Sequence, residues 1–150
     1  MRKVVFCLTA MLALTCASCG NKNNIYPVSG KVTYKGSPAS GATVFFCRKG
    51  GDTTNDHMIM AIVGGDGLFE LVCGSLGKGA PPGEYDVLIE WKQVSGQRHG
   101  RPQHGPDKFK GRYADRKHPR LHAVVNAGPN NLPPFDLPDA ELSRKRPESP

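Results

Sequence analysis

The chain has 150 residues and a formal net charge of +7 at pH 7, from 20 lysines and arginines against 13 aspartates and glutamates. That length suffices for one domain with a hydrophobic core and excludes two domains of ordinary size. The 18 glycines and 13 prolines are typical of a chain with many turns, and no apolar run at helical spacing is long enough for a helix of about three turns.

The first 18 residues have the pattern of a secretory signal peptide. Arg2 and Lys3 precede an apolar run over residues 4–17, which is shorter than the about 20 residues that cross a bilayer core. The run has the length of a signal-peptide apolar region. We therefore predict that residues 1–18 are removed and take no part in the fold. The remaining 132 residues (150 − 18) carry 18 basic and 13 acidic side chains, a net charge of +5.

The end of this segment resembles a bacterial lipobox, in which the peptide is cut before a cysteine whose thiol carries a diacylglycerol. Residues 17–20 read Ala-Ser-Cys-Gly, so the resemblance implies that Cys19 is the acylated first residue of the mature chain. Position 16 is a departure, because it holds cysteine where leucine is usual. A shifted reading that acylates Cys16 would place Thr15 at the cut. Ordinary secretion with cleavage nearby is the remaining alternative.

Acylation of Cys19 implies a membrane-anchored lipoprotein of the bacterial cell envelope, in the outer membrane or facing the periplasm. The two ester-linked chains, at about 0.8 kcal/mol per buried methylene, would make a lasting anchor. Residues 19–24 would then form a short polar tether that stays solvated.

The first part of the mature chain predicts two neighbouring β-strands. Residues 26–34 and 42–47 are rich in valine and threonine, and turn-forming residues lie between them. In the second run Ala42, Val44 and Phe46 share one face, which can supply the core.

Five further runs continue the pattern of short strands. Residues 58–63 and 68–73 are separated by Gly-Gly-Asp-Gly, which predicts a hairpin. In residues 84–91, apolar and charged side chains alternate, with Leu88 the single exception. Residues 121–127 and 132–137 complete the set. Seven such runs predict an all-β fold, a single antiparallel seven-stranded β-sandwich of the prealbumin or immunoglobulin kind, over residues 25–137.

Four short motifs within these runs carry a resemblance to a known family. They are residues 30–32 (Gly-Lys-Val), 36–44 (GSPASGATV), 66–69 (Asp-Gly-Leu-Phe) and 82–85 (Pro-Gly-Glu-Tyr). In this order they resemble the carboxypeptidase regulatory-like domain, also called transthyretin-like, and the chain is similar to small bacterial lipoproteins built around that domain. The resemblance implies a prealbumin-like β-sandwich without catalytic residues of its own.

Cys47 and Cys73 are a candidate disulfide in an oxidising compartment. The alternation of side chains along each strand does not favour the pair. Cys73 lies on the same face of its strand as Phe69 and Leu71, whereas Cys47 lies on the face of its strand away from Val44. Two separate, half-buried thiols are the alternative.

Residues 95–120 predict a basic loop, since they show no strand pattern. The segment has three histidines, His99, His104 and His118. Its eight cations are the candidate anion-binding residues Arg98, Arg101, Lys108, Lys110, Arg112, Arg116, Lys117 and Arg120.

Three interpretations of this loop stay open. It is a solvated connection held to the sandwich by Phe109 and Tyr113, or an anion-binding surface for phospholipid headgroups, acidic glycans or nucleic acid, or a histidine metal site. The histidines lack compact ligand spacing, so we expect no metal. Trp91 is in register with the core face of its strand, which favours a core or sheet-end role over sugar stacking. Residues 138–150 predict a disordered tail.

The sequence predicts a functional class for the protein and its location in the cell. No nucleophile elbow, zinc-protease motif or pair of carboxylates in apolar surroundings is present, so we expect no enzyme and no cofactor. The leading hypothesis is a non-catalytic, lipid-anchored envelope domain with a structural or binding role. The alternative is a module that binds an anionic envelope polymer or lipid headgroups through residues 98–120. Expected partners are the membrane, through the lipid, and an anionic polysaccharide or envelope protein, with no nucleic acid.

Overall fold

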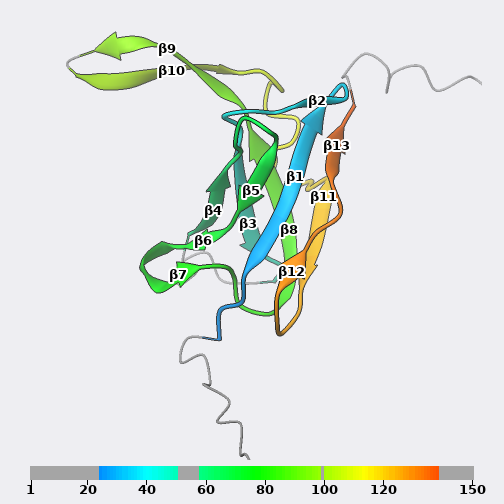
Figure 1. The fold of residues 1–150 in the computed structure, drawn as a ribbon. Helices are drawn as coiled ribbons and strands as arrows, with labels where there is room; N and C mark the ends of the chain where they lie inside the picture. Colours follow the sequence, from blue (N-terminus) through cyan, green and yellow to red (C-terminus); the bar gives the residue numbers. More distant parts are fainter. Residues whose placement is uncertain (1–23, 51–57, 99, 139–150) are drawn as a thin grey trace, which may run out of the picture.

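The computed structural model describes residues 24–50, 58–98 and 100–138, which form thirteen β-strands, one short 3₁₀-helix and no α-helix (Figure 1). The strands are β1 (Val28–Tyr34), β2 (Ser37–Pro38), β3 (Thr43–Arg48), β4 (Ile59–Ile62), β5 (Leu68–Glu70), β6 (Val72–Cys73), β7 (Gly77–Lys78), β8 (Gly83–Glu90), β9 (Lys92–Arg98), β10 (Arg101–Asp107), β11 (Leu121–Val125), β12 (Asn130–Asn131) and β13 (Phe135–Leu137). The 3₁₀-helix, η1, covers Gly74–Leu76. Within the described ranges no helix is long and apolar enough to cross a membrane. The predicted signal peptide, Cys19, and the tail from residue 139 lie outside these ranges.

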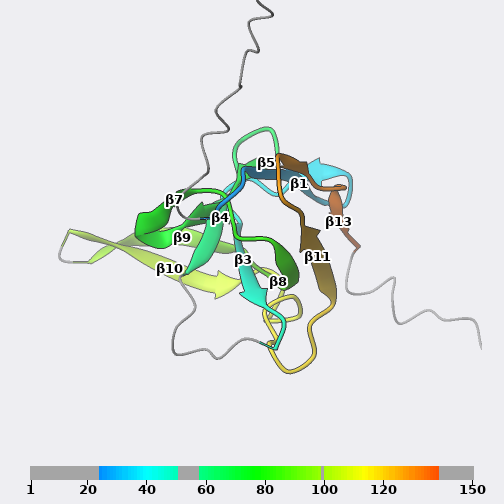
Figure 2. The same cartoon turned by 90° about the horizontal axis from the view of Figure 1, so that it is seen from below.

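Two sheets pack face to face, as Figure 2 shows. One has six strands in the order β11-β8-β3-β4-β6-β7, and every neighbouring pair is antiparallel. The other is built around β1, which pairs with β5 and β2 along one edge and with β12 and β13 along the other. β9 and β10 form a separate hairpin that projects from the sandwich (Figure 1). The predicted all-β sandwich is confirmed.

The core lies between the sheets and is formed by alternate residues of each strand. Val44 and Phe46 of β3 are buried, whereas their neighbours are half exposed, as the sequence pattern predicts. In β8, Tyr85, Val87 and Ile89 are almost completely buried. The alternation predicted for residues 84–91 is therefore the alternation between the core and the outer face of the sheet.

The predicted turn at residues 64–67 is present, but the strand after it changes sheets. The Gly67 N–H donates to the Gly64 carbonyl at 3.0 Å, and Gly67 has φ +85°, which favours glycine. β5 then pairs with β1 in one sheet, while β6 pairs with β4 in the other. Leu71, between them, is only 1 % exposed. The chain thus crosses between the layers with a core side chain at the crossing point.

The pairing of β1 differs from the entirely antiparallel arrangement that was predicted. β12 and β13 run parallel to β1, because the chain crosses to the β1 sheet after β11 and then runs in the direction of β1. Both strands are short, since Pro133 and Pro134 separate them and proline cannot donate to a strand ladder. Breaks of this kind divide the seven predicted runs into more numerous, shorter strands.

The prediction of a loop over residues 95–120 is wrong for residues 95–107, which belong to a β-hairpin. β9 and β10 pair from Lys92 with Asp107 to Arg98 with Arg101, with register shifts on either side of His104. Apolar alternation marks a strand only where one face packs on a core. Nearly every described residue of this hairpin is exposed, including Val94 at 62 %. Residues 92–107 are called the basic arm below.

Candidate functional site

The long axis of the sandwich joins two ends that differ in their side chains. At the Trp91 end, β1 and β8 finish, and the basic arm and residues 108–120 begin (Figure 1). Residues 108–120 are called the 108–120 loop. At the Ile25 end, the described chain starts and β3 and β11 finish (Figure 1). The predicted anion-binding cations all belong to the arm and the loop.

Aromatic side chains attach the 108–120 loop to the Trp91 end. Phe109 and Tyr113 are 7 % and 6 % exposed, and their ring centroids are 5.2 Å apart. Phe109 also contacts Tyr34 of β1 at 5.3 Å and Trp91 at 5.7 Å. The Ile89 N–H donates to the Tyr113 carbonyl at 2.9 Å, which adds a backbone contact with β8. Phe109 and Tyr113 therefore hold the loop to the sandwich, as predicted.

Asp107 joins the arm to the loop. One carboxylate oxygen accepts the Trp91 N–H and the other accepts the Gly111 N–H, both at 2.8 Å. Its backbone carbonyl accepts the Lys110 N–H at 3.0 Å. Charge-assisted bonds of this kind are the stronger ones. The base of the arm and the first turn of the loop are thus fixed by one side chain.

Trp91 lies at the end of the sheet, packed against the core, as predicted. Its indole N–H donates to the Ser40 carbonyl at 2.9 Å. The Lys108 ammonium lies 3.6 Å from the ring centroid, well within the range of a cation–π contact. Since Lys108 covers this ring, the arrangement does not favour sugar stacking on Trp91.

The eight predicted cations do not form one compact cluster. Arg98 and Arg101 lie opposite each other near the tip of the arm, and the other six lie in the loop against the sandwich. The Arg112 guanidinium is 6.0 Å from the Tyr113 ring. Among the described residues, six of the cations form no ion pair with a carboxylate: Arg101, Lys108, Lys110, Arg116, Lys117 and Arg120.

Two cations at the other end of the sandwich have carboxylate partners, whereas Arg48 donates to the Pro82 carbonyl at 3.1 Å. Lys49 lies 3.4 Å from Glu84, and Lys78 lies 3.2 Å from Glu70. Both pairs are exposed, so each contributes little to folding stability. They neutralise Lys49 and Lys78, however, and more of the cations without a carboxylate partner lie in the arm and the loop.

Two groups of the loop have perturbed pKa values. Burial raises the pKa of the Tyr113 phenol, an effect that Arg112 and Arg120 oppose. The hydrogen bond from His118 lowers the pKa of Asp115, and the Lys117 N–H acts in the same direction. Each of these shifts has a local structural cause, which is burial for Tyr113 and hydrogen bonding for Asp115.

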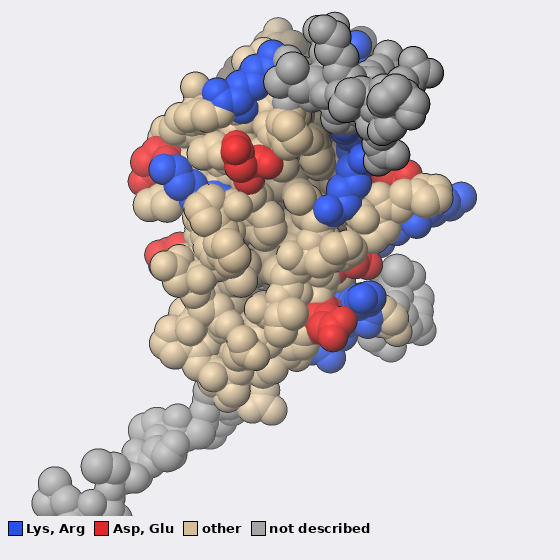
Figure 3. Space-filling view, turned by 90° about the vertical axis from the view of Figure 1, so that its right-hand side faces the viewer, with Lys and Arg blue, Asp and Glu red and all other residues tan. Residues whose placement is uncertain are grey.

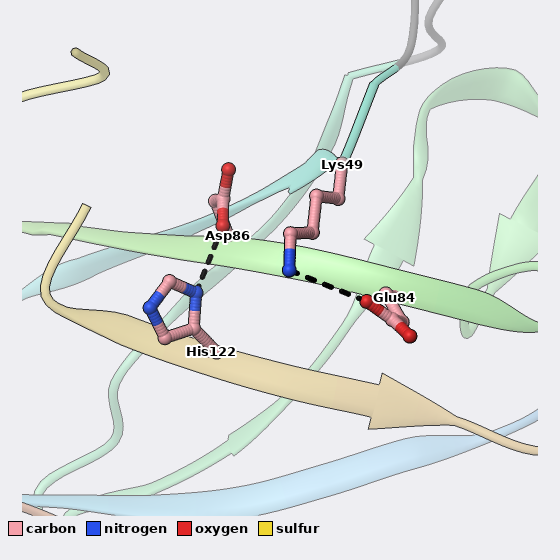
Figure 4. Close-up of polar contacts among 4 residues, drawn as sticks. All are labelled: Lys49, Glu84, Asp86 and His122. Carbon is pink, nitrogen blue, oxygen red and sulfur yellow. Dashed lines mark hydrogen bonds and ion pairs between the residues drawn. The ribbon is translucent and has the colours of Figure 1, made fainter. Parts of the chain in front are cut away.

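Figure 4 shows a second polar group, on the outer face of the six-stranded sheet. His122 and Asp86 lie opposite each other on β11 and β8, with the ring Nδ1 2.9 Å from the carboxylate. Lys49 and Glu84 lie next to them. The sequence pattern missed this pair, because the alternation marks both side chains only as outward-facing. In residues 24–50, 58–98 and 100–138, no three His, Cys, Asp or Glu side chains lie close enough to hold a metal ion.

The candidate disulfide between Cys47 and Cys73 is not formed, which corrects that prediction. Cys47 is half buried on β3, and Cys73 is buried on β6, with β4 between the two strands. Two strand spacings are about 9.5 Å, beyond the about 7 Å limit between bridged Cα atoms. The two thiols also lie on opposite faces of the sheet, as face counting indicated.

An apolar groove of about 330 Å³ lies between the edges of the two sheets, along β11 and the β12–β13 segment. Its lining residues are His122, Ala123, Val124, Leu132, Pro133 and Phe135. Figure 3 faces this side of the molecule, where uncharged residues cover most of the surface. The groove has almost no polar groups that would orient a ligand.

No protein-family model matches this chain, and no curated protein is similar to it. Three chains of solved structures match this chain, among them the following two. A 9R-lipoxygenase from Cyanothece PCC8801 aligns over 91 % of this chain and 18 % of its own, with 10 % identity and a TM-score of 0.43. A DUF3823 family protein from Parabacteroides merdae aligns over 74 % of this chain and 44 % of its own, with 17 % identity and a TM-score of 0.38. The chain thus spans less than half the length of either protein.

Proposed function

We propose that this chain is a non-catalytic, lipid-anchored β-sandwich of a bacterial cell envelope, which binds an anionic polymer through the basic arm and the 108–120 loop. The proposal combines the lipobox-like sequence at Cys19 with the uneven distribution of charge on the sandwich. The observation that carries the binding role is the contrast between the two ends. Two cations at the Ile25 end, Lys49 and Lys78, are paired with carboxylates, and six described cations of the arm and loop are not.

The position of the two ends favours a polymer over the headgroups of the anchoring membrane. Cys19 and Ile25 are six residues apart, so the tether between them reaches at most about 20 Å. The seven residues of β1 add a rise of about 23 Å along the sandwich. Because the arm and loop lie at the opposite end (Figure 1), a protein anchored through Cys19 would present its cations away from that membrane.

The physical basis of binding is long-range attraction. Clustered Lys and Arg side chains raise the local concentration of anions, and salt screens the effect over about 8 Å at physiological ionic strength. Exposed, mobile lysines and arginines give little sequence specificity. A repetitive acidic polymer, such as a polyuronate, fits this surface because it can contact several cations in any register.

The motif glycines support a relationship with the carboxypeptidase regulatory-like domain, which we include in the proposal. Gly36, Gly41 and Gly67 have φ values of +75°, +79° and +85°. Residues other than glycine adopt these conformations only at a cost. The spacing of the motifs thus has a structural basis, since each of these glycines forms a turn that connects strands of the sandwich.

The anchor is tested by metabolic labelling with a fatty-acid analogue in a bacterial host. We expect the label on the wild-type chain and not on Cys19→Ser. Cys16→Ser, the matched control, should remain labelled. A labelled Cys19→Ser chain would exclude the Cys19 assignment, and an unlabelled wild-type chain would exclude lipidation.

The binding role is tested with the chain from position 19, carrying Cys19→Ser, on immobilised alginate. We expect retention that falls as salt rises from about 50 to about 500 mM. Replacing Arg101, Lys110, Arg116 and Lys117 by glutamine should abolish most of the retention. The control variant replaces Lys49 and Lys78 at the Ile25 end in the same way. Its retention on alginate should fall little more than its reduced net charge explains.

Each outcome of this experiment decides between the candidate ligands. Equal loss in both variants would mean that net charge alone acts, and would overturn a site at the Trp91 end. Retention on vesicles with anionic lipid but not on alginate would favour headgroups instead of a polymer. No retention on either would leave the domain with the structural role.

A further inference from the structure

β11 is an outer strand of the six-stranded sheet, and in the described part of the chain it pairs with β8 alone. It lies beside the β12–β13 segment of the other sheet (Figures 1 and 2). An outer strand leaves part of its backbone N–H and C=O groups without a strand partner, and such groups can pair with another chain. The free edge of β11 therefore offers hydrogen bonds to an added strand.

The register of β8 shows which backbone groups of β11 face outward. The Glu84 carbonyl accepts a hydrogen bond at 3.0 Å from the residue that follows β3, so Glu84 bonds toward β3. The direction of the backbone groups alternates along a strand, so the next residue, Tyr85, bonds toward β11. Ala123 lies opposite Tyr85 and thus bonds inward to β8. By the same alternation, the N–H and C=O groups of His122 and Val124 face outward.

Beyond Val124 the same edge is closed by a side chain. The Asn130 amide accepts the Asn126 N–H at 2.8 Å and donates to the Asn126 carbonyl at 3.0 Å. It pairs with this backbone as a residue of a neighbouring strand would. The outward groups of His122 and Val124 have no hydrogen-bond partner among the described residues. These two N–H and two C=O groups are about 6.8 Å apart along the strand, which is the two-residue repeat of an extended antiparallel partner.

The apolar groove beside β11 supplies space for a side chain of that partner. Ala123 is half exposed on the core side of β11, and it lines the groove of about 330 Å³ together with Leu132 and Phe135. In an antiparallel pair, residues directly opposite each other have their side chains on the same face. An added residue opposite Ala123 would therefore point into the groove. An apolar side chain is favoured there, because the lining has almost no polar groups.

The other outer strands are shorter and carry residues that oppose an added strand. β7 has two residues, one of which is Lys78. β13 has three, and its Asp136 lies between Pro134 and Pro138. Proline lacks the N–H that a strand partner needs, and charged residues also discourage pairing. β11 has five residues and no Lys, Arg, Asp, Glu or Pro. It thus lacks the features by which sheets avoid pairing with other chains.

We infer that β11 binds an extended segment of another protein, which adds to the six-stranded sheet as a further antiparallel strand. The open backbone groups would give affinity, and the groove would select an apolar side chain opposite Ala123. Residues 139–150 of this chain do not fit, since six of them are charged and only Ala140 and Leu142 are apolar. Neither the anchor nor the anionic polymer is involved, because β11 lies outside the arm and the loop.

The experiment is a nuclear magnetic resonance titration of the chain from position 19 with Cys19→Ser. This chain keeps the whole core, which extends from Ile25 to Leu137. The probe is the synthetic peptide Thr-Val-Thr-Leu-Thr-Val-Thr with two lysines at each end. We expect a dissociation constant below about 500 μM, and slower hydrogen exchange at the His122 and Val124 amides in the complex.

Val124→Pro is the decisive variant, because it removes an outward N–H without removing a bond to β8. It should raise the dissociation constant at least about tenfold. Val124→Thr, the matched control, keeps the N–H and should bind within about threefold of the unsubstituted chain. Near-ultraviolet circular dichroism should show native packing in both variants. A probe N-methylated at alternate residues tests the same bonds from the peptide side, and it should not bind.

Absence of binding up to about 1 mM peptide would overturn the inference. So would binding that neither Val124→Pro nor N-methylation weakens. A dimer of the chain alone, dissociated by Val124→Pro, would identify a second copy as the occupant and overturn a foreign segment. Binding of dodecanoate at the groove without binding of the peptide would overturn it in favour of an alkyl chain.

Discussion

Individual side chains decide how the Trp91 end is built. Tyr113 is buried among Phe109 and the loop backbone, and its hydroxyl donates to the Pro138 carbonyl at 3.3 Å. The position of Tyr113 connects a loop residue to the last described residue of the chain. Its ionisation would place a phenolate in this half-apolar site, which is the reason for its raised pKa.

The raised pKa of Tyr113 predicts a loss of stability at alkaline pH. In the folded state the pKa lies above its ordinary value of 10.0. The folded chain therefore holds the proton more tightly than the unfolded chain does. Its contribution is complete below about pH 10 and is lost as pH rises through the folded-state pKa. Thermal unfolding between about pH 9 and about pH 11.5 measures this loss.

Tyr113→Phe is the variant that isolates the effect. It should cost about 1 kcal/mol at neutral pH, through the hydrogen bond to Pro138. Above pH 10 its melting temperature should fall less steeply than that of the wild type. An equal slope in both proteins would mean that other groups cause the alkaline loss.

Among the elements, the basic arm depends most on its connection to the rest of the chain. A two-stranded hairpin is marginally stable in water, and nearly all described residues of the arm are exposed. Asp107 ends β10 and accepts backbone N–H groups from Trp91 and Gly111. The arm therefore keeps its orientation mainly because of contacts at its base.

Removing the Asp107 carboxylate should destabilise this junction. We expect Asp107→Ala to lower the free energy of unfolding by about 2–3 kcal/mol, because two backbone N–H groups lose a charged acceptor. Asp107→Asn should recover part of the loss. The measurement is urea denaturation followed by circular dichroism.

Asp66→Ala provides the comparison for this prediction. The Asp66 carboxylate accepts one bond, from the Leu68 N–H at 3.0 Å, in an exposed turn. Its loss should cost about 1 kcal/mol. Equal costs at positions 66 and 107 would contradict the special role of Asp107.

The elements also show what sequence patterns can and cannot predict. Tyr85, Val87 and Ile89 face a core, so their period of two predicts both a strand and its buried face. β9 has no such face, so its sequence does not distinguish a hairpin from a loop. β12 pairs in parallel with β1, which is distant from it in the sequence, and local sequence patterns do not determine such long-range pairing. Of the candidate site, the sequence predicts the cations and the aromatic attachment at Phe109, but not that the cations are divided between arm and loop.

At the scale of the whole molecule, the predicted anchor and the proposed binding surface belong to opposite ends of the sandwich. β1 runs from the Ile25 end, where the described chain starts, to the Trp91 end, where the basic arm and the 108–120 loop lie (Figure 1). If the chain is anchored through Cys19, the basic end points away from the membrane.

Trp91 is the single tryptophan of the chain, and it lies where the arm, the loop and the sandwich meet. Its indole is covered by the Lys108 ammonium, one of the cations that an acidic polymer would attract. Displacement of that ammonium would change the electric field and the hydration of the ring. The protein therefore contains its own optical reporter, and a titration of ligand can be followed through ultraviolet emission without an added dye.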